Sequence, residues 1–230
     1  MKSFKTLAIA LVAAGTMLTG CNMSNTGKGA LIGGGGGGAL GAGVGALIGG
    51  GKGAAIGSAV GAAVGAGAGA LIGKKMDNQA KQLEESLPNA DVQRVEDQNG
   101  LAAIKVTFPG GILFPTGKYN LNASAQTELA QFANSLKQNP NTNVQIYGYT
   151  DNTGSMAVNA PLANNRADAV QAFLVNSGVP VTRITAQGVP MADYVASNDT
   201  AAGRAQNRRV EIYITADQKM IQQAEQGTLK

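Results

Sequence analysis

Glycine recurs at every fourth position between residues 29 and 73, and this ladder constrains the N-terminal third of the chain more than any other feature. The segment is also an internal repeat, because residues 27–50 and 51–74 are identical at 16 of 24 aligned positions. Each copy opens with Gly-Lys-Gly and then continues without a charge for about the length of one membrane-spanning helix. Glycines four apart on a helix form a groove that lets a second helix approach closely.

We therefore expect residues 29–73 to form a helical hairpin that turns near Lys52. In water each glycine costs a helix about 1 kcal/mol relative to alanine, so lipid or close helix packing has to stabilise the hairpin. The segment is similar to the glycine-zipper regions of envelope lipoproteins, which leaves open whether it enters the membrane or packs against other copies in a homo-oligomer. A flexible glycine-rich tether is the alternative, favoured locally by the six consecutive glycines at 33–38.

The first 28 residues have the layout of an export signal followed by a lipid attachment site. Two lysines precede an apolar run at 7–14 that is too short to span a bilayer as a helix. The sequence Leu-Thr-Gly-Cys at 18–21 resembles the lipobox of bacterial lipoproteins, which implies a signal peptide at 1–20, a lipid such as palmitate on Cys21 and a tether at 21–28. Asn22 favours the outer membrane, with the C-terminal domain in the periplasm. An ordinary secreted protein with a free cysteine is the alternative.

Residue types and charge exclude several classes of function. The chain has no histidine and one cysteine, so it lacks the usual general base, the commonest transition-metal ligand and an internal disulfide. Six of its 18 basic side chains lie in residues 1–75, which contain no acid, and residues 76–230 have a net charge of −2. The C-terminal part thus lacks the basic face that nucleic-acid binding requires. We expect no enzyme activity, no metal or other cofactor, and no nucleic-acid partner.

The remainder of the chain alternates between strands and helices. Residues 74–88 predict an amphipathic linker helix that ends at Pro88. A globular domain then covers residues 89–216, and a tail with a short helix covers 217–230. The domain has predicted strands at 92–95, 102–108, 143–149, 184–187 and 210–214, and predicted helices at 124–136 and 160–177, the latter with Pro161 in its first turn. This order predicts an α/β fold, or α+β sandwich, in which a mixed sheet carries helices on one face.

Two charged residues of this domain are placed unusually. Arg166 lies within the apolar stripe of helix 160–177, where an unpaired guanidinium is costly. Asp151 follows strand 143–149, at the sheet edge where open α/β sheets tend to bind ligands. Asp151 is therefore the predicted partner of Arg166.

Three blocks of sequence resemble the OmpA-like peptidoglycan-binding domain: GYTDNTG at 148–154, NAPLANNRADAV at 159–170 and GRAQNRRVEI at 203–212. The resemblance covers roughly 105–215 and implies that Asp151 and Arg166 hold the diaminopimelate of the wall peptide. An aspartate can accept from its ammonium while an arginine binds its carboxylate as a fork. The resemblance also implies that the pocket is shaped by Thr150, Thr153, Gly154, Asn159, Leu162 and Phe114.

Two departures from the family pattern lie outside the charged pair, since Pro115 replaces a common aspartate and Ala163 a common serine. An internal salt bridge is the alternative role for Asp151 and Arg166, and we expect Arg208 and Arg209 to support the fold or contact the glycan. The expected function is a non-catalytic tether between outer-membrane lipid and peptidoglycan. The alternative is a membrane-active or oligomerising glycine-zipper envelope protein in which wall binding is secondary.

Overall fold

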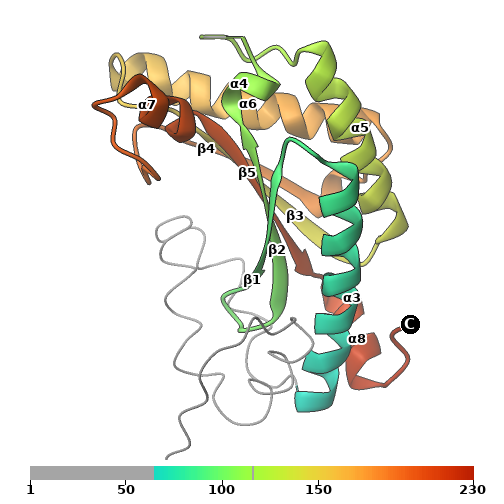
Figure 1. The fold of residues 1–230 in the computed structure, drawn as a ribbon. Helices are drawn as coiled ribbons and strands as arrows, with labels where there is room; N and C mark the ends of the chain where they lie inside the picture. Colours follow the sequence, from blue (N-terminus) through green and yellow to red (C-terminus); the bar gives the residue numbers. More distant parts are fainter. Residues whose placement is uncertain (1–64, 116) are drawn as a thin grey trace, which may run out of the picture.

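The structure, a computed structural model, describes residues 65–115 and 117–230 (Figure 1). Cys21 and the predicted hairpin turn lie outside these residues. A five-stranded sheet of order β1-β2-β5-β3-β4 forms the centre of the fold. Its strands are β1 (Asp91–Glu96), β2 (Ala102–Pro109), β3 (Thr142–Tyr149), β4 (Ile184–Val189) and β5 (Arg209–Ala216). β3 and β4 are parallel and the other neighbours antiparallel, so the predicted mixed sheet is confirmed.

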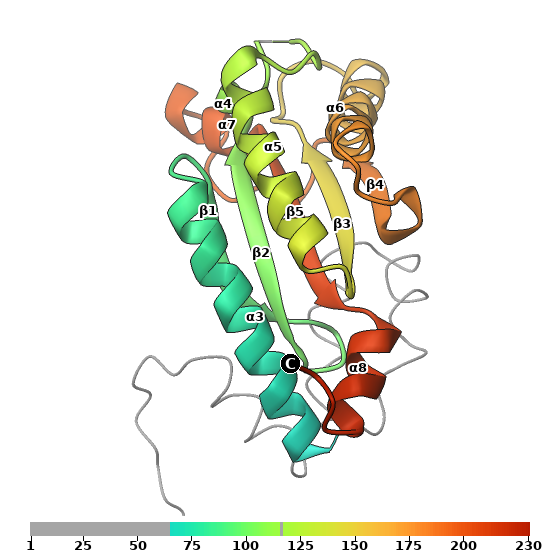
Figure 2. The same cartoon turned by 90° about the vertical axis from the view of Figure 1, so that its right-hand side faces the viewer.

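The larger helices cover one face of this sheet. Figure 1 shows α3, α5 and α8 along the same side, and Figure 2 looks onto that side. Alternate strand residues such as Val106, Ile146 and Ile212 are fully or almost fully buried beneath the helices, as the period of two in a half-buried strand requires. The helices are α3 (Ala66–Ser86), α4 (Gly110–Leu113), α5 (Ala123–Gln138), α6 (Met156–Asn176), α7 (Ala201–Asn207) and α8 (Gln218–Glu225), with a 3₁₀ turn at Val181–Arg183.

The folded unit is larger than the predicted domain at 89–216. α3 begins inside the glycine ladder and continues through the predicted linker helix without a break at residue 73. Its Met76 and Leu83 are fully buried in the same hydrophobic core as the sheet, and Met220 of α8 joins them. The linker and the tail are thus part of the domain, because their apolar stripes cover sheet and helix surface that residues 89–216 leave uncovered. None of the helices within the described residues combines the length and hydropathy needed to cross a membrane.

One helix begins earlier than its sequence pattern indicated. α6 starts at Met156, after the N-cap Ser155, and not near residue 160. Pro161 therefore lies in the second turn, where its exposed position leaves the unpaired carbonyl of the preceding turn to water. The short helices α4 and α7 and the 3₁₀ turn were not predicted, since segments of three to seven residues carry little periodic signal.

Two glycines let α6 approach the sheet closely. Gly148 and Gly188 are register partners on the parallel strands β3 and β4. A Cβ atom on Gly148 would lie 2.4 Å from the carbonyl oxygen of Ala163, and one on Gly188 would lie 2.5 Å from the amide nitrogen of Asn164. The Asn164 side chain also accepts a hydrogen bond from the Gly188 amide at 2.8 Å. The backbone of α6 therefore rests on these glycines, which fixes the position of Arg166 less than one turn further along.

The opposite face of the central strands carries a buried charged cluster around Glu211. Its carboxylate accepts from Arg209 Nε at 2.8 Å and from the Tyr213 hydroxyl at 2.9 Å, and it pairs with Lys105 Nζ at 2.9 Å. The Arg209 guanidinium in turn lies 3.7 Å from the centre of the Tyr149 ring. Burial alone raises the pKa of Glu211, but the two cations outweigh it and hold the pKa below its usual range.

This cluster makes stability depend on pH. Because the native pKa of Glu211 is lowered, its contribution is present above the unfolded pKa of about 4.3 and is lost as pH falls through the native pKa. We expect Glu211→Gln to lower the free energy of unfolding at pH 7 by about 2–3 kcal/mol, since it leaves two cations underpaired. The variant should also lose less stability than the wild type between pH 6 and pH 3. Urea unfolding at several pH values measures this, with exposed Glu225→Gln as the control.

Candidate functional site

The candidate site lies at the end of the sheet where β2 and β3 finish and β5 begins. β5 is antiparallel to both neighbours, so the carboxyl ends of β2 and β3 meet the start of β5. This topology gathers Phe114 from beyond β2, Asp151 from beyond β3 and Arg208 from just before β5. Arg166 reaches the same edge from α6. The residues come from four parts of the chain, and only the tertiary fold brings them together.

Asp151 is a buried carboxylate with both oxygens in use. It is 5% exposed, its Oδ1 accepts from the Thr153 amide at 2.9 Å, and its Oδ2 pairs with Arg208 Nη1 at 2.5 Å. Burial raises the pKa of Asp151, but the hydrogen bonds from Arg208 and Thr153 outweigh it and lower the pKa below its usual value. Asp151 is therefore ionised at neutral pH and suited to hold a cation.

The predicted ion pair between Asp151 and Arg166 is wrong. The carboxylate pairs with Arg208, because that residue immediately precedes β5, the direct neighbour of β3. For Arg208 this ion pair is compatible with the expected supporting role, and a contact with the glycan stays a prediction. Arg209 does support the fold, since its guanidinium is buried between Glu211 and the Tyr149 ring.

Arg166 is a buried cation with a donor group left over. It is 3% exposed, its Nε donates to the Lys118 carbonyl at 3.1 Å, and its Cζ lies 5.4 Å from the centre of the Phe114 ring. Burial lowers the pKa of Arg166, the charge of Arg208 lowers it further, and Asp151 opposes both. Its Nη1 is buried and has no hydrogen-bond acceptor among residues 65–115 and 117–230. Such a group is satisfied best by an incoming carboxylate.

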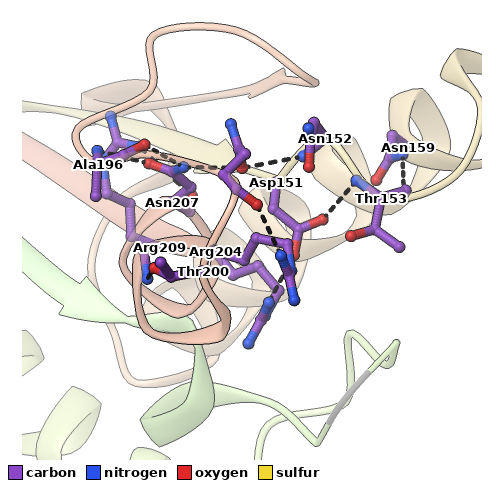
Figure 3. A network of polar contacts seen from close by, with 12 residues as sticks. Asp151, Asn152, Thr153, Asn159, Ala196, Thr200, Arg204, Asn207 and Arg209 are labelled. Carbon is purple, nitrogen blue, oxygen red and sulfur yellow. Dashed lines mark hydrogen bonds and ion pairs between the residues drawn. The ribbon is translucent and has the colours of Figure 1, made fainter.

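The loop after β3 is held rigidly by its own hydrogen bonds (Figure 3). The Asn159 side-chain amide donates to the carbonyls of Thr153 at 2.8 Å and Ser155 at 3.2 Å, which ties the loop to the first turns of α6. Gly154 has φ +89°, a conformation that favours glycine. Thr150 is buried, and its hydroxyl accepts from the Met191 amide at 3.0 Å.

The residues predicted to shape the pocket differ in how directly they contact Asp151 and Arg166. Phe114 contacts Arg166 directly, and Thr153 hydrogen-bonds Asp151. Asn159 acts through the loop, and Leu162 is half-buried one turn before Arg166 on α6.

A second loop is tied to the site by Asn207, which the sequence did not single out. Asn207 is fully buried, and its amide donates to the Ala196 carbonyl at 2.8 Å and to Asn198 Oδ1 at 2.9 Å. Its own oxygen accepts from the amides of Val195 and Ala196. Asn198 also accepts from the Asn152 amide at 3.3 Å, which links this loop to the one that carries Asp151 (Figure 3). Its sequence signal was its place in the block GRAQNRRVEI at 203–212, which assigned it no individual role.

The chemistry of the site favours binding over bond breaking. One carboxylate and two guanidiniums can hold a small group that carries both charges, but arginine does not act as a base at neutral pH. Within the part of the chain that the structure describes, no three His, Cys, Asp or Glu side chains are grouped to hold a metal ion.

Comparison with known proteins agrees with this geometry. Residues 113–208 match the OmpA family, and residues 1–80 match the YMGG-like Gly-zipper family. The probable lipoprotein YiaD of Escherichia coli is 40% identical over 112 residues, which cover 49% of this chain and 51% of YiaD. The peptidoglycan-binding protein ArfA of Mycobacterium tuberculosis is 39% identical over 127 residues, or 55% of this chain and 36% of ArfA. The matches thus span about half of YiaD and about a third of ArfA.

A solved structure shares the same fold. The cell wall anchor of the T6SS from Pseudomonas aeruginosa aligns with a TM-score of 0.53 at 28% identity, covering 60% of this chain and 97% of the anchor. The sheet and helices of the anchor therefore correspond to most of the described residues of this chain.

Proposed function

This chain carries a C-terminal OmpA family domain behind a YMGG-like Gly-zipper segment, and we propose that it tethers the outer membrane to peptidoglycan. The OmpA family domain is a peptidoglycan-binding module without catalytic activity. The lipobox at 18–21 supports a lipid on Cys21 as the membrane end of the tether. Two acyl chains suffice for stable attachment, because each buried CH₂ contributes about 0.8 kcal/mol.

The observation that carries the wall-binding end is the unused donor of Arg166 close to the ionised Asp151. The side-chain end of diaminopimelate has an ammonium and a carboxylate on one carbon. In our proposal Asp151 accepts from the ammonium and Arg166 binds the carboxylate, which fills its empty position. The rigid loop at 150–154 and the Phe114 ring hold the two charges in place, so little entropy is lost on binding.

The alternative, an oligomerising glycine-zipper protein, depends on the ladder at 29–73, of which the structure describes only residues 65–73. There α3 is already helical and its Gly69 and Gly73 are buried within the domain. This end of the ladder thus serves the fold of the wall-binding domain, and we retain the tether as the proposed function.

Co-sedimentation with purified sacculi tests the tether. The mature chain in detergent should pellet with sacculi and release no muropeptides. Asp151→Asn should weaken binding at least tenfold, or about 1.4 kcal/mol, because the ligand ammonium loses its counter-charge. Asp168→Asn, which changes an exposed carboxylate on α6, is the matched control and should bind as the wild type does. Unchanged binding by Asp151→Asn, or muropeptide release, contradicts the proposal.

A further inference from the structure

Arg208 forms an ion pair with Asp151, the carboxylate to which the proposed function assigns the ammonium of the ligand. Its Nη1 pairs with Asp151 Oδ2 at 2.5 Å, while the other oxygen of Asp151 is held by the Thr153 amide. Each oxygen of Asp151 thus already accepts one hydrogen bond, and Oδ2 is held by a guanidinium. A cationic ligand group that binds Oδ2 competes with Arg208 for this carboxylate.

The backbone of Arg208 is fixed, but its side chain is free to move. The Arg208 carbonyl accepts from the Gly110 amide at 2.6 Å, and its own amide donates to the Arg204 carbonyl at 3.0 Å. The side chain is 33% exposed, and within the described residues Asp151 is its only hydrogen-bond or ion-pair partner. Arg208 can thus release Asp151 by side-chain rotation alone, without rearrangement of β5 or α7.

We propose that Arg208 is a displaceable counter-ion of Asp151. Its charge makes the site select a group with an ammonium and a carboxylate on the same carbon over a plain amine. This inference rests on the proposed function. With Asp151, Arg166 and Arg208 charged, the site carries a net charge of +1. A plain ammonium that takes Asp151 raises this charge to +2 and leaves two guanidiniums without an anion. An ammonium with a carboxylate on the same carbon adds no net charge, and its carboxylate supplies a new partner for Arg166 and the released Arg208.

The electrostatic coupling between the two arginines supports this role. The charge of Arg208 lowers the pKa of Arg166, so the two guanidiniums repel each other across the site. Displacing Arg208 from Asp151 without providing an anion strengthens that repulsion in a buried environment, where charges are poorly screened. A ligand carboxylate placed between the arginines relieves it. The selectivity therefore comes from a penalty on the wrong ligand, in addition to attraction for the right one.

Two tripeptides that differ only at the third residue provide the test: L-Ala-γ-D-Glu-meso-diaminopimelate and L-Ala-γ-D-Glu-L-Lys. Calorimetry with the mature chain should show that the wild type binds the diaminopimelate peptide at least 30-fold more tightly. Arg208→Gln should reduce this preference at least fivefold, chiefly because the lysine peptide binds better. Arg208→Lys keeps the charge and should retain the preference. Lys137→Gln, which removes an exposed cation in the last turn of α5, is the matched control and should leave the preference unchanged within about twofold.

The possible failures are distinguishable. If Asp151→Asn leaves the binding of both peptides unchanged, the proposed function itself is overturned. If Asp151 is needed but Arg208→Gln keeps the full preference, or weakens both peptides equally, only the role of Arg208 is overturned. Loss of preference in Arg208→Lys, with a normal thermal unfolding curve, also contradicts a role that depends on its charge.

Discussion

Replacing Arg166 with methionine is expected to abolish binding to peptidoglycan while leaving the protein as stable as the wild type, or more stable. The guanidinium is almost completely buried, its Nη1 has no acceptor within the described residues, and its lowered pKa reports the cost of burying the charge. Methionine fills a similar volume without that cost, so we expect the free energy of unfolding to rise by up to about 2 kcal/mol. Sacculus binding should fall at least 100-fold, because the ligand carboxylate loses its buried partner.

Arg183→Met is the control, and we expect the opposite effects on stability and on sacculus binding. The Arg183 Nε donates to the Thr142 carbonyl at 2.7 Å, and its other nitrogens donate to the carbonyls of Leu136 and Asn139 at 2.9 Å. It lies beside the start of β3, at the other end of the sheet from Asp151. Arg183→Met should therefore lose about 3 kcal/mol of stability and keep sacculus binding. Urea unfolding and co-sedimentation on both variants measure the contrast, and a destabilised Arg166→Met that still binds sacculi contradicts our assignment.

Gly148→Ala is expected to cause a large loss of stability from a single added methyl group. The new Cβ would lie 2.4 Å from the Ala163 carbonyl oxygen and 3.2 Å from the Ala167 amide nitrogen, both backbone atoms of α6. Because backbone cannot rotate away as a side chain can, α6 has to move off the sheet. We expect a loss of about 3 kcal/mol, or roughly 10 °C in Tm for a fold of this size. Displacement of α6 should weaken sacculus binding as well, since it carries Arg166.

Gly111→Ala is the matched control for this prediction. A Cβ on Gly111 meets no atom within 4 Å, and the residue has no positive φ. Alanine at this position of α4 should be neutral or stabilise the protein by up to about 1 kcal/mol. Calorimetric Tm values for both variants decide the matter, and similar Tm values for Gly148→Ala and wild type would show that α6 does not rest on this strand as described.

Most strands and helices of this chain can be predicted from the repeating patterns of its sequence. Every predicted strand is present, because alternation along a strand is set by which face is buried and needs no knowledge of neighbours. The predicted helix at 124–136 is present as α5, and the apolar residues Met220 and Ile221 of the tail do lie on a short buried helix. The charge distribution and the residue types do not depend on the fold. They therefore excluded several classes of function from the sequence alone.

The assignment of contacts between distant residues depended on the fold. The sequence identified Asp151 and Arg166 as unusual but paired them with each other, whereas Asp151 pairs with Arg208, 57 residues away. That choice follows from strand order, because β5 lies between β2 and β3 and delivers Arg208 beside the end of β3. The joining of α3 and α8 to the domain was hidden for the same reason: an amphipathic stripe shows that a helix is covered, but not by what.

What the sequence determined by itself is therefore local: the glycine ladder, the resemblance of residues 18–21 to a lipobox, the order of strands and helices along the chain, a guanidinium within an apolar stripe and a carboxylate directly after a strand. What only the tertiary structure decided is which charges meet and which donor is left without a partner. Periodicity reports the burial of each residue, whereas an ion pair depends on the distance between two atoms. That distance is set by the packing of α6 on Gly148 and Gly188 and by the antiparallel placement of β5.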